Sequence, residues 1–549
     1  MPAGQHKTML SISLLHFDAV ALRLGIALVA RFVRFIRKVK FFEKSLLFTN
    51  IAAMTSSKIN IAKRNYDPAD AASIFAFSKG LLHKTLAEAV TLLDSTIKPE
   101  DIVSKGKGGL GQMVEKFYYG YEPNSCPDAD FQEAGVELKT TPLKRNVKEE
   151  LQIKERLVCD MIDFCRIVDI PFEDSPFYKK SLLMLIIFYL HVKGVELRDL
   201  EFLYSVLWKL QDKDLLIIKQ DYETIVSKIK AGKAHELSEG DTLYLAACRK
   251  GQKGDSLRKQ PFSDIGAPQR AFSLKPAYMR TILDFVKSSG KEMVTNTDIR
   301  LPEIELVSVK ELASSSFEQV MIQRFDVFKG QDYRQIAGAF KMGINPHDKS
   351  RYARVVKRIM KEGHAKFEDA EEVRKAGLVV KTVRVEVNGR IKEDMSFENI
   401  DYEEVYETED WVDSRWYEIV TSRFLFVVFR AVEGCRTGWD NETRYVLDKV
   451  FFWTMPSGDM KEAEDYWLNI RQNVVKDTLQ DSTNTYWKLS DGKDFHVRPK
   501  ARRRTDVSFS PVSKVEVPKK AYWFNGSYVQ KILQWAYAGS GKGLFEEYS

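Results

Sequence analysis

The sequence predicts an α/β protein built from two tandem, related domains, and three observations support this fold class. The chain has 549 residues, more than a single hydrophobic core usually serves. Helical and strand patterns alternate along it, and the apolar runs LLMLIIFYL (182–190) and FLFVVF (424–429) are typical of strands buried on both faces. Similar segments also recur, in the same order, in each half of the chain.

The internal repeat consists of two well-matched pairs of segments. AGVELKT (134–140) resembles AGLVVKT (376–382), and PQRAFSLKPAYMRTIL (268–283) resembles PKKAYWFNGSYVQKIL (518–533). A looser pair of amphipathic helical patterns lies at 81–90 and 330–340. We therefore predict an N-terminal extension at 1–53, a first domain at 54–290, a linker at 291–307 and a second domain at 308–549.

The bulk charge is no argument for a nucleic-acid partner. The net charge is +7, but residues 1–53 hold eight Lys or Arg against Asp18 and Glu43, so the rest of the chain is nearly neutral. The five cysteines show no CxxC spacing, which argues against a disulfide framework and a structural zinc site. A reducing prokaryotic cytoplasm suits this cysteine content.

The N-terminal extension is apolar, but it is a poor membrane span. His16, Asp18 and Arg23 interrupt the run LSISLLHFDAVALRLGIALVA, and a span tolerates few such groups. Two other interpretations remain open: a segment resembling a transit peptide, and translation that begins at Met54. We leave residues 1–53, whose authenticity is doubtful, out of the fold and expect no membrane association.

The segment DFQEAGVELKTTP carries the candidate chemistry of the first domain. In a strand that begins near Gly135, alternation places Glu137 and Lys139 on one face and turns Val136 and Leu138 into the core. An isolated ExK motif is more often a surface ion pair of little energetic value. With an acid just upstream, however, two carboxylates can hold Mg²⁺ beside a lysine, which is the arrangement that phosphodiester hydrolysis needs.

Two acids upstream compete for the place beside Glu137. Asp130, seven residues before it, is the preferred acid, and Pro127-Asp128 supplies a literal "PD" alternative. A third carboxylate is predicted on the helical pattern LGQMVEKFYYG (110–120), where Glu115 lies beside an apolar stripe. The alternative for Glu115 is a solvated position on the helix.

With these residues in place, the first half resembles the MutH family of endonucleases, which belong to the PD-(D/E)xK superfamily with a restriction-endonuclease-like fold. The matching positions are Glu115, Asp130, Phe131, Gly135, Glu137, Leu138, Lys139, Thr140 and Pro142. From about residue 65 to the end, the chain resembles the two-domain type II restriction endonucleases of this family. The resemblance implies Mg²⁺-dependent cleavage at GATC, on the 5′ side of the G. It also implies a second active-site lysine, either Lys180, which we prefer, or Lys179.

The resemblance further implies a DNA-reading region between residues 233 and 279. Arg249 and Lys250 match the loop in which basic side chains can meet guanine edges, although simple phosphate contact is the alternative. Arg270 and Lys275 are weaker candidates for the same DNA-facing surface. The HELSE segment at 235–239 lacks the second histidine of a zinc-protease motif, so we interpret it as structural or as shaping that loop.

Carrying the active-site residues across the repeat predicts that the second copy is catalytically degenerate. With an offset of 242 residues, the counterparts of Glu115, Asp130, Glu137 and Lys139 are Lys357, Glu372, Val379 and Lys381. A valine cannot ligate a metal ion. The basic stretch FHVRPKARRRTD nevertheless resembles a recognition loop, with Arg498, Lys500, Arg502, Arg503 and Arg504. We predict that this half binds DNA as an effector domain, the alternative being a solvated charge run.

The sequence thus predicts a type II restriction endonuclease that cleaves both strands at GATC. The alternatives are a MutH-type mismatch-repair nicking enzyme and a DNA-binding regulator that does not cleave. The expected cofactor is Mg²⁺, and the expected partner is double-stranded DNA that carries one or two GATC copies. In solution we expect a monomer, with DNA able to induce a dimer or a loop.

Overall fold

A computed structural model describes residues 64–103, 109–124, 126–146, 148–251, 257–297, 305–360, 370–437, 442–500 and 506–538. The predicted N-terminal extension and the predicted DNA contacts Arg502, Arg503 and Arg504 lie outside the described residues. The described residues form two compact units, one made of residues 64, 65 and 114–124 and the other of those within 66–113 and 126–538. None of the helices within these described ranges is long and apolar enough to cross a membrane.

The smaller unit contains the π-helical turn η4 (Val114–Tyr119), which carries Glu115. Arg64 holds this turn, since its Nε donates to the carbonyl oxygen of Tyr118 (2.9 Å) and its Nη2 to that of Phe117 (2.6 Å). The sequence pattern predicted one regular helix over 110–120. In the structure a short α-helix, α4 (Gly109–Met113), gives way to the wider turn at Val114.

The larger unit contains a five-stranded mixed sheet in the order β10-β5-β4-β1-β2. Its strands are β1 (Glu137–Arg145), β2 (Leu151–Ile153), β4 (Leu183–Leu190), β5 (Phe202–Lys209) and β10 (Met293–Thr295). Strand β4 pairs in parallel with β1 and antiparallel with β5, so it is central to the sheet. Its residues 184–188 are completely buried, which explains the unbroken apolar run and confirms the strand predicted there.

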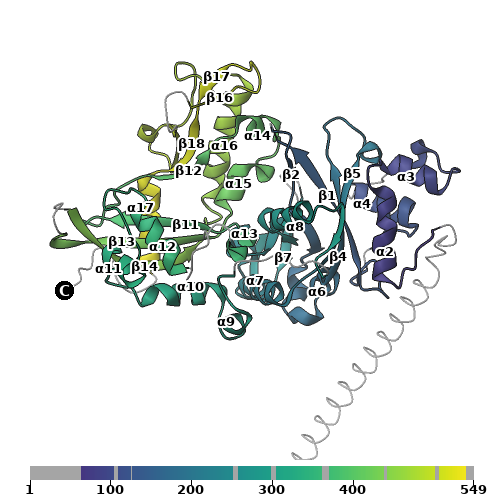
Figure 1. The fold of residues 1–549 in the computed structure, drawn as a ribbon, viewed down its shortest axis with the longest axis horizontal. Coiled ribbons are helices and arrows are strands. Elements are labelled where there is room, and N and C mark those ends of the chain that lie inside the picture. The colour runs from purple at the N-terminus through teal and green to yellow at the C-terminus, as the bar shows by residue number, and fades with distance from the viewer. Residues whose placement is uncertain are drawn as a thin grey trace, which may run out of the picture. The chain divides into compact units, whose positions relative to one another are not determined.

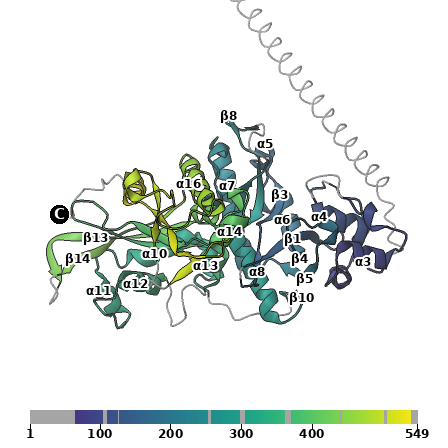
Figure 2. The ribbon, with the colours of Figure 1, turned by 90° about the horizontal axis from the view of Figure 1, so that it is seen from above.

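Helices cover both faces of this sheet (Figures 1 and 2). Helix α2 (Ala71–Phe77) contacts β5 and α4 contacts β1, whereas α6 (Pro176–Ser181) contacts β4 and α8 (Pro276–Ser289) contacts β2 and β10. The remaining helices of the first half are α3 (Leu86–Leu93), α5 (Phe164–Ile167) and α7 (Asp212–Lys230). Strand β10 belongs to this sheet although it falls in the predicted linker, because three residues are too few to display an alternating pattern.

A smaller three-stranded sheet, in the order β3-β9-β6, adjoins the first one. Its strands are β3 (Leu157–Met161), β6 (Leu245–Arg249) and β9 (Arg270–Leu274). A two-stranded hairpin of β7 (Arg258–Gln260) and β8 (Ser263–Ala267) lies between β6 and β9 along the chain. The HELSE segment is anchored to this hairpin, since the Gln260 side chain hydrogen-bonds His235 Nδ1 (3.0 Å).

The second half repeats these strand orders. Its sheets are β11-β13-β14, β12-β18-β15 and β16-β17, which correspond to β1-β4-β5, β3-β9-β6 and β7-β8. The strands are β11 (Val379–Val385), β12 (Met395–Asn399), β13 (Phe424–Thr437), β14 (Glu442–Trp453), β15 (Phe495–Pro499), β16 (Val507–Phe509), β17 (Glu516–Pro518) and β18 (Lys520–Phe524). As β1 does with β4, β11 pairs in parallel with β13.

The helices of the second half follow the same plan. They are α9 (Val309–Ser314), α10 (Phe317–Asp326), α11 (Tyr333–Ala339), α12 (Arg351–Met360), α13 (Glu371–Ala376), α14 (Tyr402–Glu407), α15 (Arg415–Val420), α16 (Met460–Val475) and α17 (Gly526–Ala538). Thr85 and Asp332 begin α3 and α11 with capping boxes, in which side chain and backbone satisfy each other. The resemblance between 81–90 and 330–340 therefore reflects equivalent capped helices.

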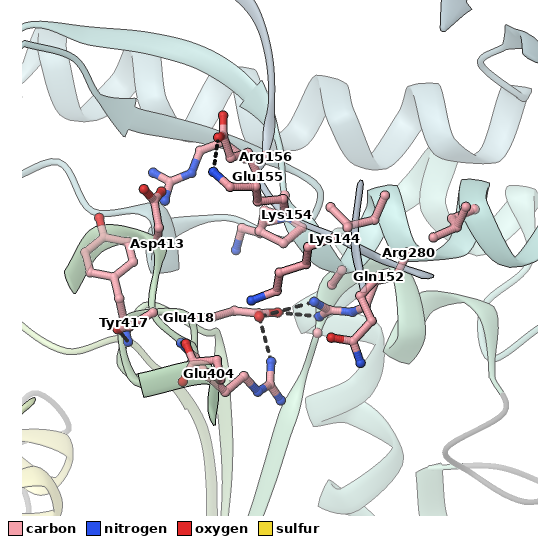
Figure 3. A pocket seen from close by; sticks show the side chains of 18 of the residues that line it. Lys144, Gln152, Lys154, Glu155, Arg156, Arg280, Glu404, Asp413, Tyr417 and Glu418 are labelled. Carbon is pink, nitrogen blue, oxygen red and sulfur yellow. Dashed lines mark hydrogen bonds and ion pairs between the residues drawn. The ribbon is translucent and has the colours of Figure 1, made fainter. Parts of the chain in front are cut away.

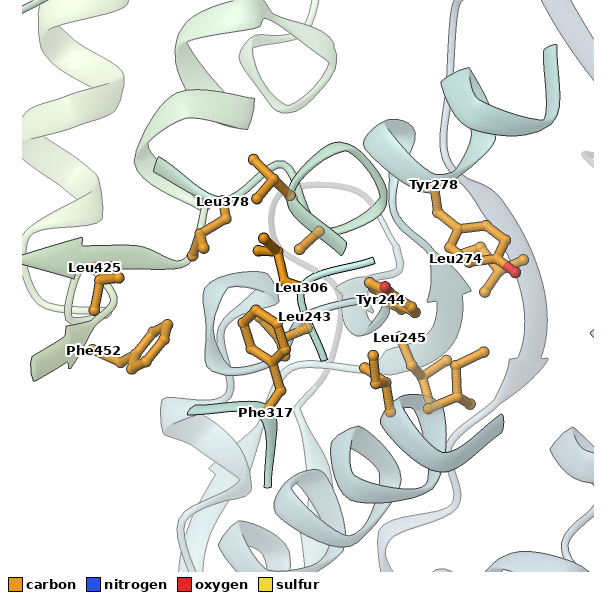
Figure 4. Close-up of a cluster of buried hydrophobic side chains, with 14 of the residues drawn as sticks. Leu243, Tyr244, Leu245, Leu274, Tyr278, Leu306, Phe317, Leu378, Leu425 and Phe452 are labelled. Atoms are coloured by element: carbon orange, nitrogen blue, oxygen red, sulfur yellow. The ribbon is translucent and has the colours of Figure 1, made fainter. Parts of the chain in front are cut away.

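One hydrophobic core runs through both halves (Figure 4). Leu243, Tyr244 and Tyr278 of the first half belong to the same buried cluster as Phe317 and Phe452 of the second. A separate cluster around Trp416 and Phe524 fills the interior of the second half. Removing one half would therefore expose apolar side chains that the other half buries.

Helix α13 of the second half is also joined to α7 of the first half by a buried network of ion pairs. Lys375 Nζ lies 2.9 Å from Asp214 Oδ2 and also pairs with Glu371, while Lys213 Nζ lies 2.8 Å from Glu372 Oε1. All five of these side chains are buried. Buried cations and anions are tolerated only where they face one another, so α13 is held in one position against α7.

A cavity of about 650 Å³ lies beside this network, with walls from both halves (Figure 3). Within it, Arg280 of α8 points toward Glu418 (Figure 3). An oxygen of Glu418 also lies 2.7 Å from Nη1 of Arg415 on α15. Lys144, Lys154 and Glu404 also face the space. The cavity is lined by ion pairs that join the halves, and none of the predicted catalytic residues lines it.

Candidate active site

Asp130, Glu137 and Lys139 meet at the start of β1. Lys139 Nζ lies 2.6 Å from Glu137 Oε1, and the Asp130 amide donates to Glu137 Oε2 at 3.2 Å. The Leu138 amide donates in turn to Asp130 Oδ2 at 2.9 Å. The structure therefore brings together Asp130, Glu137 and Lys139, the two acids and the lysine that the segment DFQEAGVELKTTP was predicted to supply.

A tight turn explains how an acid seven residues upstream reaches Glu137. Phe131 and Val136 exchange both backbone hydrogen bonds across the turn, at 2.9 and 3.2 Å. Gly135 within the turn has a φ of +64°, a left-handed conformation that glycine adopts without the strain of a side chain. Asp130 precedes the first bridged residue and Glu137 follows the second, so the two carboxylates are adjacent.

Burial gives this cluster unusual electrostatics. Glu137 is only 2% exposed. Loss of solvent, followed by repulsion from Glu137, raises the pKa of Asp130 to about 6, with Lys139 and Lys180 acting against that shift. Burial disfavours the charged form of Lys139, but the combined effects of Glu137, Cys159 and Asp130 outweigh it and the pKa of Lys139 is raised. A positive charge beside these carboxylates therefore stabilises the site.

The two candidate lysines on α6 point to different partners. The charge of Lys180 acts to lower the pKa of Asp130 and of Asp160, so it lies close enough to influence both acids. Lys179 Nζ lies 3.6 Å from Asp128 Oδ1, and both side chains are about half exposed. The surface ion pair of Lys179 with Asp128 of the literal "PD" leaves Lys180 as the preferred candidate.

Asp160 on β3 is an acid of this region that the sequence analysis did not identify. Burial raises its pKa, while the charges of Lys180 and Lys139 lower it. It reaches the centre because β3 pairs with β9 and passes beside α6. No short motif links Asp160 to Glu137, so nothing local in the sequence could have identified it.

The place of Glu115 remains a prediction. It lies on η4, is half-buried, and its carbonyl oxygen accepts from the amides of Gly120 (2.9 Å) and Tyr121 (3.1 Å). Within the part of the chain that the structure describes, no group of three or more His, Cys, Asp or Glu side chains is arranged to hold a metal ion. The two carboxylates that do come together are Asp130 and Glu137.

The register of the second sheet places Val379 where Glu137 stands in the first. Val379 lies opposite Phe424 of β13, as Glu137 lies opposite Met184 of β4, and two residues further on Lys381 lies opposite Phe426, as Lys139 lies opposite Ile186. These pairings support the predicted correspondence residue by residue.

Glu372, the predicted counterpart of Asp130, has a structural role. Glu372 lies on α13, where its carboxylate accepts from the Leu306 and Val307 amides and pairs with Lys213. Its oxygens are occupied in the contact between the halves.

The predicted DNA-contacting residues fall into three groups. Arg249 is exposed at the end of β6, and Lys250 follows it at the edge of the segment 252–256, which lies outside the described residues. Arg498 projects from β15, half exposed, with its guanidinium 5.0 Å from the Trp523 ring. Lys500 follows β15 and donates to the carbonyl oxygen of Phe397.

Arg270 and Lys275, by contrast, are buried inside the fold. Arg270 donates to the carbonyl oxygens of Ala247 (3.1 Å) and Leu237 (2.5 Å), and Lys275 donates to that of Thr242 (2.5 Å). Burial lowers the pKa of Lys275 to about 8. This placement disagrees with the expected DNA-facing surface. Arg270 lies on β9, which pairs with β6, and Lys275 lies at the start of α8, and backbone carbonyl groups enclose both side chains. Neither residue enters the DNA-binding proposal.

Comparison with known proteins complements this geometry. Residues 119–221 match the family "DNA mismatch repair enzyme MutH", a range that includes Asp130, Glu137, Lys139 and Lys180. The chain is 32% identical over 475 residues to the type II restriction enzyme Sau3AI of Staphylococcus aureus, which covers 82% of this chain and 92% of that protein. It is also 28% identical over 187 residues to the DNA mismatch repair protein MutH of Shewanella woodyi, covering 33% of this chain and 78% of the relative.

Proposed function

The chain belongs to the family of type II restriction enzymes that includes Sau3AI, with a MutH-type domain in its first half, and we propose that it cleaves both strands of DNA at GATC, 5′ of the G. The observation that carries this proposal is the cluster of Glu137, which is buried, with Asp130 and Lys139, which are partly buried. The two adjacent carboxylates repel each other, and this repulsion helps to raise the pKa of Asp130. Acids with shifted pKa values cluster at functional sites, which favours a cutting centre here.

Mg²⁺ is the proposed cofactor, and the donor set fits it. Carboxylate oxygens are hard ligands, and one or two of them together with water and a substrate phosphate are enough for this ion. Repulsion between Glu137 and Asp130, which helps to raise the pKa of Asp130, is what a divalent cation would relieve. Asp130 and Glu137 would hold the ion, with Glu115 as a proposed third ligand. When bound, it would neutralise charge on the phosphate and activate water.

The two lysines would act on the phosphate and the attacking water. Lys139 is fixed by its ion pair with Glu137, so its ammonium group is oriented before DNA arrives. It can donate a hydrogen bond to a water or to a non-bridging phosphate oxygen. Lys180 supplies a second positive charge from α6, near Asp130 and Asp160.

Lys180 and Lys179 offer a matched pair of variants. Lys180→Ala should lower the single-turnover cleavage rate by about 10²-fold, the size of effect typical for one charge-stabilising donor. Lys179→Ala should cleave close to the wild-type rate, because its partner is the half-exposed Asp128. Cleavage of a labelled GATC duplex under enzyme excess measures both. The opposite ranking would assign the second active-site lysine to Lys179.

We propose that the second half, from about residue 308, is a catalytically degenerate copy that binds DNA as an effector. The loss of a carboxylate at Val379 and the use of Glu372 in the contact between the halves support this. Ser308 caps α9 and therefore suits the start of this domain. The first domain is proposed to span 54–290, and β10, which lies in the proposed linker at 291–307, adds a strand to its sheet by pairing with β5.

The proposed DNA contacts are basic residues near the ends of equivalent strands. Arg249 and Lys250 follow β6 in the first half. Arg498, Lys500, Arg502 and Arg503 lie in and after β15, which is the equivalent strand of the second half. Phosphate contacts of this kind position DNA, and contacts with base edges would specify GATC.

Plasmid cleavage tests the proposed function. Plasmids with unmethylated GATC, adenine-methylated GATC or no GATC are incubated with the full-length protein in Mg²⁺ or in EDTA. We expect linear product from GATC plasmids in Mg²⁺ only. Nicks confined to unmethylated strands would indicate a mismatch-repair activity instead, and no cleavage of any plasmid would indicate a DNA-binding regulator.

A further inference from the structure

A pocket of about 230 Å³ lies in the second half, on the face of β11 that carries Lys381. Its walls come from residues 381–384 of β11, from the connection 392–396 that leads into β12, and from Val529 of α17. By the register of the two sheets, Lys381 stands where Lys139 stands in the cutting centre. The pocket therefore adjoins the former active centre of this copy.

Lys381 differs from Lys139 in the partner of its ammonium group. Lys139 is paired with Glu137 at 2.6 Å, but Val379 occupies the equivalent position beside Lys381. The Lys381 ammonium instead donates to the carbonyl oxygen of Ser396 at 2.6 Å and lies 4.0 Å from the Phe397 ring centre. Its side chain is partly buried, so it remains open to the pocket.

The other charged side chains at the pocket are neutralised in pairs. Arg384 pairs with Glu393, Lys392 with Glu386, and Asp394 with Arg498 and the Gly526 amide. Of the three cations that line the pocket, Lys381 alone has no ion pair among the residues that the structure describes.

Among the described residues, the carboxylate whose charge acts on Lys381 is that of Glu398. It is paired with Arg415 at 2.5 Å. Burial and the nearby charge of Lys500 lower the pKa of Lys381 to about 7. An anion bound beside this partly buried amine would favour its charged form.

We propose that this pocket binds a backbone phosphate of DNA directly to Lys381, without a metal ion. The proposal rests on the proposed DNA-binding role of the second half. In the cutting centre, Asp130 and Glu137 repel a phosphate unless a cation lies between them. At Val379 that repulsion is gone, so the loss that ended catalysis leaves a site with net attraction for an anion.

DNA phosphate is the anion that the location favours. Strand β18 lies between β12, which forms one wall of the pocket, and β15, which leads into the proposed DNA-contacting loop. Arg498 on β15 pairs with Asp394 at the pocket, so a duplex held by that loop would pass near Lys381. A phosphate oxygen accepts strong, charge-assisted hydrogen bonds from an ammonium group.

The test measures DNA affinity of the full-length protein in EDTA, where cleavage and metal-bridged binding are absent. Lys381→Met keeps the length of the side chain and removes its charge. It should raise the Kd for a GATC duplex about five- to tenfold and make the slope of log Kd against log salt smaller by about one. Val379→Glu should weaken binding similarly, because it gives Lys381 the carboxylate partner that Lys139 has. Circular dichroism checks that each variant is folded.

Two controls sharpen this experiment. Lys461→Met removes an exposed lysine of α16 that already pairs with Asp465, and it should leave the affinity and the salt slope unchanged. A duplex with single methylphosphonate linkages removes one phosphate charge at a time. One such linkage should weaken wild-type binding and have no further effect on Lys381→Met.

Each contrary outcome overturns the proposal in a recognisable way. Wild-type affinity and salt slope for Lys381→Met would exclude the DNA contact. If inorganic phosphate, measured by calorimetry, binds wild type but not Lys381→Met while DNA affinity is unchanged, the pocket takes only the free ion. If Arg502→Ala/Arg503→Ala weakens DNA binding and Lys381→Met does not, the pocket proposal alone fails. If neither does, the DNA-binding role of the second half fails as well.

Discussion

Replacing Lys139 with alanine, or Glu137 with glutamine, is expected to lower the rate of DNA cleavage by about 10³-fold or more, since each change removes a charge on which transition-state stabilisation depends. Glu137→Gln removes a proposed magnesium ligand and the partner of Lys139 while it keeps the shape of the side chain. Binding of a GATC duplex in EDTA should change little, because neither side chain is among the proposed recognition contacts.

Single-turnover cleavage in Mg²⁺ and Kd in EDTA measure the two effects separately. Arg145→Ala is a matched control on the same strand, since Arg145 is exposed at the far end of β1 and pairs only with Glu149 at 3.7 Å. It should cleave at the wild-type rate. If Lys139→Ala cuts nearly as fast as this control, the cutting centre lies elsewhere.

Replacing Lys375 with methionine is expected to lower the free energy of unfolding by about 3–5 kcal/mol, the cost of leaving a buried charge without its partner. Lys375 is 2% exposed, and its ammonium lies within 3.0 Å of both Asp214 oxygens. Without it, the fully buried Asp214 loses its ammonium partner, and of the two carboxylates only Glu371 keeps a lysine, Lys213 at 3.4 Å, among the described residues. Denaturant titration of the full-length protein measures the loss.

The neighbouring residue on α13 provides the control. Arg374 pairs with Asp284 at 2.9 Å, but both side chains are about half exposed, so Arg374→Ala should cost only about 0–1 kcal/mol. A similarly small loss for Lys375→Met would mean that water reaches the network. A large loss for Lys375→Met alone would show that the halves unfold as a coupled unit, as their shared core suggests.

Local patterns were enough to predict much of the fold. The apolar runs at 182–190 and 424–429 formed strands β4 and β13, and alternation placed Glu137 and Lys139 on one face of β1. Such patterns work because burial on both faces requires continuous apolar residues, and a strand turns successive side chains to opposite sides.

Predictions that depended on contacts between residues far apart in the sequence were less accurate. Strand β10 was placed in the linker because it is recognisable only by its pairing with β5. Arg270 and Lys275 were expected on a surface, but basic character alone does not show that backbone carbonyls of β6 and its approach will enclose them. Asp160 was missed for the same reason, since it lies 23 positions beyond Glu137 and reaches the centre through the path of β3.

The sequence by itself determined the family of this protein, because the likeness to its relatives is a property of residue order. It also predicted the acids and the lysine of a cutting centre, and the loss of the carboxylate at Val379 in the second copy. Only the tertiary structure decided that Lys179 pairs with the half-exposed Asp128, that Glu372 serves the contact between the halves, and that Lys381 is partly buried without an ion pair among the described residues. The physical reason is the distance along the chain over which each effect acts. Residue type and spacing act within one element, whereas the charge state and partners of a buried group depend on every element packed around it.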